Sequence, residues 1–219
     1  MGLPKELRPA VFLDRDEVIN TSKRKDITDR PLTPLKPADM IIFSFVGRCI
    51  KELNRLGFLV FIITNQPAVA KGQMNFDDLQ QMHAMIFHHV FIAGGELREI
   101  YVCPHHPDPN QVVVEKLLLD CDCRMPKPGM ILRARDFFKI DLENSWVVGN
   151  SRENIEAGKK AGCRTILIKN QFDVSQENIC QPGFRAKNLE EAVTFISEKK
   201  TLEDAFIWQK HRNPSRFDG

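Results

Sequence analysis

The chain has 219 residues, of which 42% are hydrophobic, and a formal net charge of +2 at pH 7. This length is enough for one substantial core and demands no second domain. The near balance of charge gives no electrostatic reason to expect binding to nucleic acid or to an anionic membrane. Because no segment has the uninterrupted apolar length of a membrane span, we expect a soluble, cytoplasmic protein.

The first predicted strand stops at a pair of acids. Residues 11–20 read V-F-L-D-R-D-E-V-I-N, so an apolar run ends at Asp14 and Asp16. Side chains two positions apart in an extended chain share a face, which would bring these two carboxylates together. One ionised carboxylate can attack phosphorus, while its neighbour, kept protonated by the shared negative charge, protonates the leaving oxygen. An isolated D-x-D is more typical of an Asx turn or a helix cap, so the pair needs support from elsewhere in the chain.

Alternating helices and strands are predicted after this pair from hydrophobic periodicity and turn residues. Such alternation implies an α/β fold with a parallel, doubly wound (Rossmann-like) sheet, right-handed crossovers and helices on both faces. We expect a single domain over residues 1–199 and a C-terminal tail over residues 200–219. In chain order, the predicted elements are a proline-rich loop over residues 20–39, a helix over 45–56 capped by Ser44, a strand over 58–63, a helix over 76–91 capped by Asn75, a strand over 99–102, a helix over 129–139, a strand over 146–148, a helix over 153–161, a strand over 164–168 and a helix over 189–196.

Three polar residues follow the second predicted strand. Thr64, Asn65 and Gln66 come directly after a continuous run of β-branched and aromatic residues. Open α/β sheets bind ligands beyond the carboxyl ends of their strands, so these side chains are candidates for a binding site. Capping of the next turn is the alternative role for polar residues in this position.

Four potential zinc ligands frame a polar loop over residues 103–123. Cys103 and His105 stand at one end of the loop, and Cys121 and Cys123 stand at the other. Three thiolates and one imidazole make a full tetrahedral set for Zn²⁺ with no open position, so the site should be structural. Buried free thiols are the alternative, and His106 is a competing imidazole.

Taken together, these motifs resemble the haloacid dehalogenase superfamily. They are D-R-D-x-V-I-N after the first strand, T-N-Q after the second, and a C-x-H, C-x-C, R-x-P-x-P-G segment, all within residues 9–169. They are similar to the branch without a large cap domain, which contains D-glycero-D-manno-heptose 1,7-bisphosphate phosphatase and histidinol-phosphatase. The resemblance implies a magnesium-dependent phosphatase in which Asp14 is the nucleophile and Asp16 is the general acid and base. It also implies zinc in the cysteine-rich loop.

The resemblance assigns further roles to individual residues. It makes Thr64 the hydroxyl that binds phosphoryl oxygens, and it places Mg²⁺ among Asp14, Asp16 and the residue at position 150, which is Asn150 here. Contacts with the substrate or with the nucleophile loop are then expected from Asn20, Asn65, Gln66, Arg124 and Lys127.

The chain departs from the family pattern at several of these positions. The family has R-K-P-x-P-G and V-G-D-x-x-x-D, whereas this chain has Met125 for the lysine, with Lys127 two residues on, and Asn150 and Asn154 for the aspartates. Asn150 still offers a carbonyl oxygen to Mg²⁺, but the site loses a negative charge. At about 4 Å and an effective dielectric near 20, a unit charge is worth on the order of 4 kcal/mol, so weaker Mg²⁺ binding is expected. Two smaller departures, at positions where the family has glycine, are Glu17 and Ala68.

Two classes of function follow from this pattern. The first is a magnesium-dependent phosphomonoesterase of carbohydrate metabolism, acting on a small phosphorylated metabolite. A heptose-type sugar bisphosphate is the first choice and histidinol phosphate the second. The other class is a catalytically impaired relative that binds a phosphorylated ligand or a protein partner. End-processing of nucleic acid depends only on the basic run at residues 23–25 and is the least favoured function.

Overall fold

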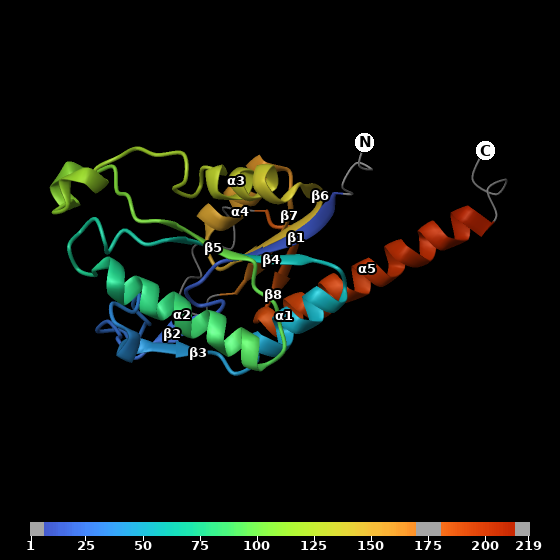
Figure 1. Cartoon of the computed structure of the whole chain (residues 1–219), viewed down its shortest axis with the longest axis horizontal. Helices are drawn as coiled ribbons and strands as arrows, with labels where there is room; N and C mark the ends of the chain where they lie inside the picture. The colour runs from blue at the N-terminus through green and yellow to red at the C-terminus, as the bar shows by residue number, and fades with distance from the viewer. Residues whose placement is uncertain (1–6, 170–180, 213–219) are drawn as a thin grey trace.

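A six-stranded sheet forms the centre of the protein, with all neighbouring strands parallel in the order β5-β4-β1-β6-β7-β8 (Figure 1). The computed structural model describes residues 7–169 and 181–212. This sheet confirms the predicted doubly wound α/β class. Its strands are β1 (Arg8–Leu13), β4 (Leu59–Asn65), β5 (Glu99–Cys103), β6 (Ile140–Gly149), β7 (Arg164–Ile168) and β8 (Phe184–Ala186).

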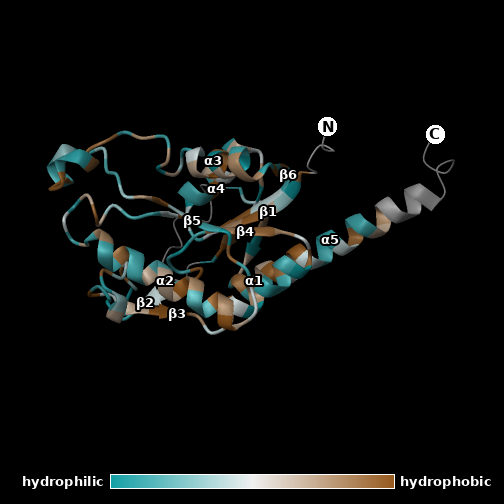
Figure 2. Cartoon of the chain, viewed as in Figure 1, coloured by the Kyte–Doolittle hydropathy of each residue, from teal (hydrophilic) through white to brown (hydrophobic). Residues whose placement is uncertain are grey.

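Helices cover both faces of the sheet because its strands alternate between two apolar clusters. Along β1, Val11 and Leu13 belong to one cluster, whereas Ala10 and Phe12 belong to the other. Figure 2 shows β4 as strongly apolar. The first cluster includes residues of α1 (Val46–Arg55), α2 (Phe76–Ile92) and α5 (Leu189–Arg212), and the second includes residues of α3 (Gly129–Phe138) and α4 (Arg152–Ala161).

The register of the central strands brings three chain segments to one edge of the sheet. Leu13 of β1 lies opposite Ile62 of β4 on one side and opposite Val148 of β6 on the other. The residues that follow these strands therefore emerge together at their carboxyl ends, where parallel sheets place binding sites. These residues include Asp14, Thr64 and Asn150.

The segment between β1 and α1 is more ordered than the loop we predicted. It contains an antiparallel pair made by β2 (Asn20–Ser22) and β3 (Met40–Ile42), with a 3-10 helix, η1 (Pro37–Asp39), before β3. Each of these strands is only three residues long, so neither repeats a hydrophobic pattern that the sequence analysis could detect in this proline-rich segment. No large cap domain fits in this insertion. Two further 3-10 helices, η2 (Pro109–Gln111) and η3 (Glu115–Leu117), lie in the cysteine-rich loop.

The predicted helix caps had different outcomes. Asn75 caps α2 as predicted, because its side chain accepts a hydrogen bond from the backbone N–H of Asp78 at 2.6 Å. The prediction that Ser44 caps α1 is wrong. The residue before this helix is Phe45, whose side chain makes no capping hydrogen bond.

The last helix is longer than predicted. The expected end was residue 196, but α5 continues to Arg212 and extends away from the sheet (Figure 1). It therefore crosses the expected boundary between domain and tail at residues 199 and 200, and that division remains a prediction. The apolar spacing of α5 weakens after Ile196, which is why the sequence suggested an earlier end. Across the two described ranges, no helix combines the length and apolar character needed to span a membrane.

Candidate active site

Asp14 lies at the carboxyl end of β1, beside β6. Its backbone N–H donates to the carbonyl oxygen of Val148 at 2.9 Å, and its own carboxylate accepts from the backbone N–H of Arg15 at 2.8 Å. Burial, followed by the neighbouring Asp16 carboxylate, raises the pKa of Asp14 to about 7. A bound cation would favour the ionised form that a nucleophile needs.

Three side chains hold the Asp16 carboxylate in place. Arg15 donates to it from Nε at 2.9 Å and from Nη2 at 2.8 Å and 3.1 Å. The amide nitrogens of Asn20 and Gln66 each donate at 3.1 Å. Because Arg15, Asn20 and Gln66 are fully buried, they fix the orientation of the carboxylate from the protein side.

Gln66 also links Asp16 to Thr64. Its Nε2 lies 3.1 Å from Asp16 Oδ2 and 2.9 Å from Thr64 Oγ1, so one amide group contacts both side chains. The structure therefore brings together the three residues that we predicted to be catalytic, Asp14, Asp16 and Thr64. Their chemical roles remain predictions.

The two acids have different surroundings. Burial is the main cause that raises the pKa of Asp14. The assignment of the shared proton to Asp16 stays a prediction. The Asp16 carboxylate accepts hydrogen bonds from the Arg15 guanidinium and from the amide groups of Asn20 and Gln66. The two acids look alike in the sequence, whereas in the structure they have different hydrogen-bond partners.

Arg15 is the main residue of this site that the sequence analysis missed. It stands between the two aspartates in sequence and is completely buried. Strand alternation could not predict its direction, because β1 ends at Leu13 and Arg15 lies in the loop after it. A buried guanidinium needs a charged partner, and Asp16 is that partner.

The predicted substrate-binding residues are only partly brought together. Asn20 and Gln66 contact Asp16. Asn65 instead holds the backbone of Met125, accepting from its N–H at 3.1 Å and donating to its carbonyl oxygen at 3.0 Å. The remaining two predicted residues bind other groups. Arg124 donates to the carbonyl oxygen of His105 at 3.2 Å, and Lys127 forms an ion pair with Asp120 at 2.6 Å.

Two cavities lie on either side of Glu17 and Asn150. The smaller, of about 160 Å³, is also lined by Asp16 and by Arg30 and its neighbours in the segment after β2. The larger, of about 260 Å³, contains Phe43, Phe45, Lys169, Lys187 and Asn188 among its walls. The smaller cavity therefore lies directly beside Asp16.

Asp14, Asp16 and Asn150 form a donor set that suits Mg²⁺. All three offer oxygen ligands, which this hard cation prefers. Within residues 7–169 and 181–212, no hydrogen bond engages the Asn150 side chain, so its carbonyl oxygen is available. The raised pKa of Asp14 also fits a site completed by a cation.

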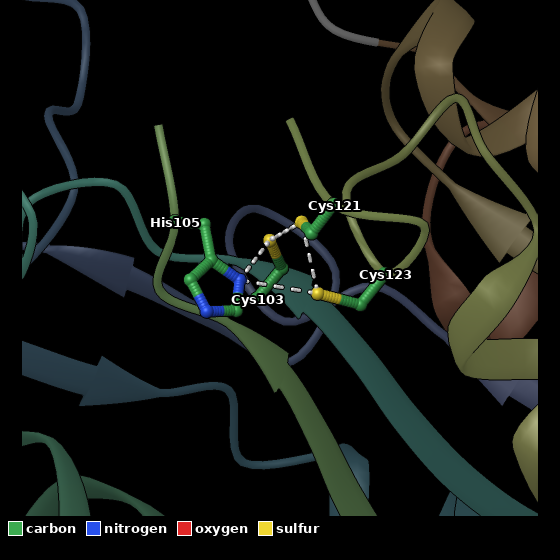
Figure 3. Close-up of side chains that lie close together, drawn as sticks. All are labelled: Cys103, His105, Cys121 and Cys123. Atoms are coloured by element: carbon green, nitrogen blue, oxygen red, sulfur yellow. Dashed lines mark hydrogen bonds between the residues drawn. The ribbon is translucent and has the colours of Figure 1, made fainter. Parts of the chain in front are cut away.

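The structure brings all four predicted zinc ligands together (Figure 3). The Sγ atoms of Cys103 and Cys121 lie 3.5 Å apart, those of Cys121 and Cys123 lie 3.1 Å apart, and His105 Nδ1 lies 3.3 Å from Cys123 Sγ. These separations are near the edge of about 3.8 Å expected for a tetrahedron with Zn–S bonds of about 2.3 Å. Burial raises the pKa of the Cys103 thiol, so a cation is needed to favour its thiolate.

His106 does not compete for this position. Its Nδ1 accepts a hydrogen bond from the backbone N–H of Asp108 at 3.2 Å. The four residues fit a structural zinc ion, which would hold the cysteine-rich loop against the end of β5.

The parallel sheet, the aspartate pair after β1 and the threonine of β4 together define a protein of the haloacid dehalogenase class. In agreement, the family model described as HAD-hydrolase-like matches residues 122–192. A protein named D-glycero-beta-D-manno-heptose-1,7-bisphosphate 7-phosphatase from Vibrio cholerae is 33% identical over 171 residues, covering 78% of this chain and 86% of the relative. A D-glycero-alpha-D-manno-heptose-1,7-bisphosphate 7-phosphatase from Photorhabdus laumondii is 34% identical over 171 residues, covering 75% and 85%.

Solved structures give the same assignment. A putative HAD-like phosphatase from Mesorhizobium loti has a TM-score of 0.72 at 26% identity, covering 92% of this chain and 91% of that one. The fold is also shared, at 24% identity and a TM-score of 0.72, with the D,D-heptose 1,7-bisphosphate phosphatase of B. bronchiseptica complexed with magnesium and phosphate. This match covers 87% of this chain and 99% of that one. The chain belongs to the haloacid dehalogenase superfamily, in the family of the D-glycero-D-manno-heptose-1,7-bisphosphate phosphatases.

Proposed function

We propose that the protein is a magnesium-dependent phosphomonoesterase that removes one phosphoryl group from a sugar bisphosphate of the D-glycero-D-manno-heptose 1,7-bisphosphate type. The names of its relatives from Vibrio cholerae and Photorhabdus laumondii support this choice of substrate. The main structural support is the contact network at the sheet edge, in which Gln66 joins Asp16 to Thr64 beside Asp14.

In the proposed reaction, a carboxylate oxygen of Asp14 attacks phosphorus and the bond from phosphorus to the sugar oxygen breaks. Asp16 gives its proton to that oxygen, so the sugar leaves as an alcohol and Asp14 carries the phosphoryl group. Water then attacks phosphorus and gives a proton to Asp16, which releases inorganic phosphate and restores Asp14. The Thr64 hydroxyl donates to a phosphoryl oxygen during both steps.

The metal site proposed here consists of the oxygen atoms of Asp14, Asp16 and Asn150. Mg²⁺ held by these residues would neutralise phosphoryl charge and favour the ionised form of the nucleophile. We place the rest of the substrate in the two cavities that share Glu17 and Asn150, where Arg30, Lys169 and Lys187 supply positive charge. In this proposal Asn20 and Gln66 orient Asp16 through their hydrogen bonds to its carboxylate. Arg124 and Lys127 remain candidate substrate contacts.

We also propose a cytoplasmic location. All five cysteines in the described part of the chain are free thiols, including the closely spaced Cys103, Cys121 and Cys123. Free thiols in such proximity favour a reducing compartment. The proposed partner is a small phosphorylated metabolite, and nucleic acid is not favoured because the formal net charge is only +2.

Asn150 favours the second candidate function, a catalytically impaired protein that binds a phosphorylated ligand or a protein partner. An amide at this position removes one negative charge from the proposed metal site. Histidinol phosphate is the alternative substrate if the protein is an enzyme.

The experiment that separates these functions measures phosphate release with and without added Mg²⁺. Purified protein is tested on D-glycero-D-manno-heptose 1,7-bisphosphate and on histidinol phosphate, together with Asp14→Asn and the control Asp136→Asn, which lies on the exposed face of α3. We expect turnover of the sugar bisphosphate by native protein and by the control, and none by Asp14→Asn. Absence of turnover by native protein at saturating Mg²⁺ would support the impaired protein instead.

A further inference from the structure

The side chain of Asn154 is fixed by its neighbours in a single orientation. It is almost completely buried at the third position of α4. Its Oδ1 accepts hydrogen bonds from the backbone N–H of Ser151 at 3.0 Å and from the Ser151 hydroxyl at 2.7 Å. Because the oxygen is occupied by these two donors, the amide nitrogen has to point the other way.

The amide nitrogen of Asn154 faces two acceptors. It lies 3.4 Å from the sulfur of Met125, and it is placed near enough to Asp14 to act as a donor that lowers the pKa of that carboxyl. The two N–H groups of one amide can satisfy both contacts. Asn154 therefore contacts a buried thioether and lies beside the proposed nucleophile.

The position of Met125 is set by its own backbone. Asn65 binds both the N–H and the carbonyl oxygen of this residue, at 3.1 Å and 3.0 Å. Asn154 also packs closely against Gly149, because a Cβ added to Gly149 would lie 2.3 Å from the Asn154 side chain. The contact between the sulfur and the amide is thus held from both ends by residues next to the site.

An aspartate at position 154 would be incompatible with these surroundings. It would place an oxygen where Nδ2 now lies, against the Met125 sulfur, which cannot donate to it, and beside the Asp14 carboxylate, whose negative charge would repel it. A positive charge at position 125 would compensate for this repulsion. Conversely, a lysine at position 125 would face the amide hydrogens of Asn154 in a buried setting.

We propose that Asn154 is a positioning residue for Asp14, and that Met125 and Asn154 form one neutral unit whose members have to be exchanged together. For its activity readout, this inference rests on the proposed phosphatase function. Met125 and Asn154 replace the lysine and the aspartate of the family pattern. Met125 and Asn154 are not two independent losses, because one removes a positive charge and the other removes a negative charge at the same contact.

A double-mutant cycle tests the coupling. The four proteins are native, Met125→Lys, Asn154→Asp and the combined variant, and each is unfolded with urea and assayed for kcat and KM at fixed Mg²⁺. Asn154→Asp alone should lower kcat by at least about tenfold and reduce the urea midpoint, and adding Met125→Lys should recover most of both. Asn75→Asp, which adds the same charge at an exposed cap, is the matched control for charge alone.

A fifth variant separates positioning from general stability. Asn154→Ala removes the donor to Asp14 without adding charge, so kcat should fall by about tenfold while KM stays near its native value. The proposal is overturned if the combined variant unfolds as easily as Asn154→Asp alone, or if the effects of the two exchanges simply add. The urea arm gives this answer even in a protein without turnover, so failure of the proposed activity and failure of the coupling remain distinguishable.

Discussion

Replacement of Asn150 by aspartate should strengthen Mg²⁺ binding. The side chain follows β6 at the sheet edge, lines a cavity together with Asp16, and is only half-buried. A unit charge about 4 Å from the cation is worth on the order of 4 kcal/mol at an effective dielectric near 20. Partial exposure and repulsion from Asp16 and Glu17 reduce this gain. We therefore expect Asn150→Asp to bind Mg²⁺ at least about tenfold more tightly, a difference of about 1.4 kcal/mol.

Isothermal titration of Mg²⁺ into protein that retains its zinc would measure this difference. Asn188→Asp is the matched control, because Asn188 lines the adjoining cavity and caps α5 through the N–H of Glu191, a role that aspartate can also fill. The control should bind Mg²⁺ much like the native protein. Equal affinities for the native protein and Asn150→Asp would show that position 150 does not face the cation, and the proposed metal site would then be wrong.

Three further predictions concern the rest of the molecule. Native protein should contain about one zinc per chain by elemental analysis; Cys123→Ser should lose it, whereas Cys163→Ser, outside the cluster, should keep it. Gln66→Met removes a hydrogen bond to the Asp16 carboxylate, worth roughly 1.5–3 kcal/mol, so kcat should fall at least about tenfold, while the exposed control Gln81→Met should not change it. Burial, with Arg15 as the next cause, lowers the pKa of His83 from 6.5 to about 4, so between these values the unfolded chain binds a proton that the folded protein does not. Stability should therefore decline by up to about 3 kcal/mol as the pH falls through this window, and urea unfolding should show a shallower decline for His83→Gln but not for the exposed His88→Gln.

The central sheet was predictable because its strands carry their own signal. In β4 a continuous β-branched and aromatic run is buried on both faces, and it ends in the polar residues that line the site. The three-residue strand β8 carries no such run, and α5 outlasts its apolar spacing, so neither could be predicted from periodicity. Local sequence sets an element only where the element is long enough to repeat its pattern.

The candidate site was predictable in its members but not in its contacts. The spacing of Asp14 and Asp16 and the position of Thr64 after a strand identified the residues that meet at the sheet edge. No local pattern could show that Met125 touches Asn154, because 29 positions separate them in the chain. In the sequence, the missing lysine at position 125 and the missing aspartate at position 154 look like unrelated changes. Only tertiary packing shows that the two positions are in contact.

The charges at the site favour a metal-dependent enzyme over a metal-free binder of phosphorylated ligands. Asp14, Asp16 and Glu17 bring three carboxylates to one sheet edge, and the guanidinium of Arg15 is already bonded to Asp16. The other predicted phosphate contacts are engaged elsewhere, Arg124 with a backbone carbonyl and Lys127 with Asp120. Arg30, Lys169 and Lys187 line the adjoining cavities, but at Asp14 and Asp16 a phosphate dianion meets carboxylates, and a divalent cation would offset their repulsion. Phosphate binding and phosphate transfer should therefore share one requirement for Mg²⁺, and a ligand that bound tightly without the cation would contradict this arrangement of charges.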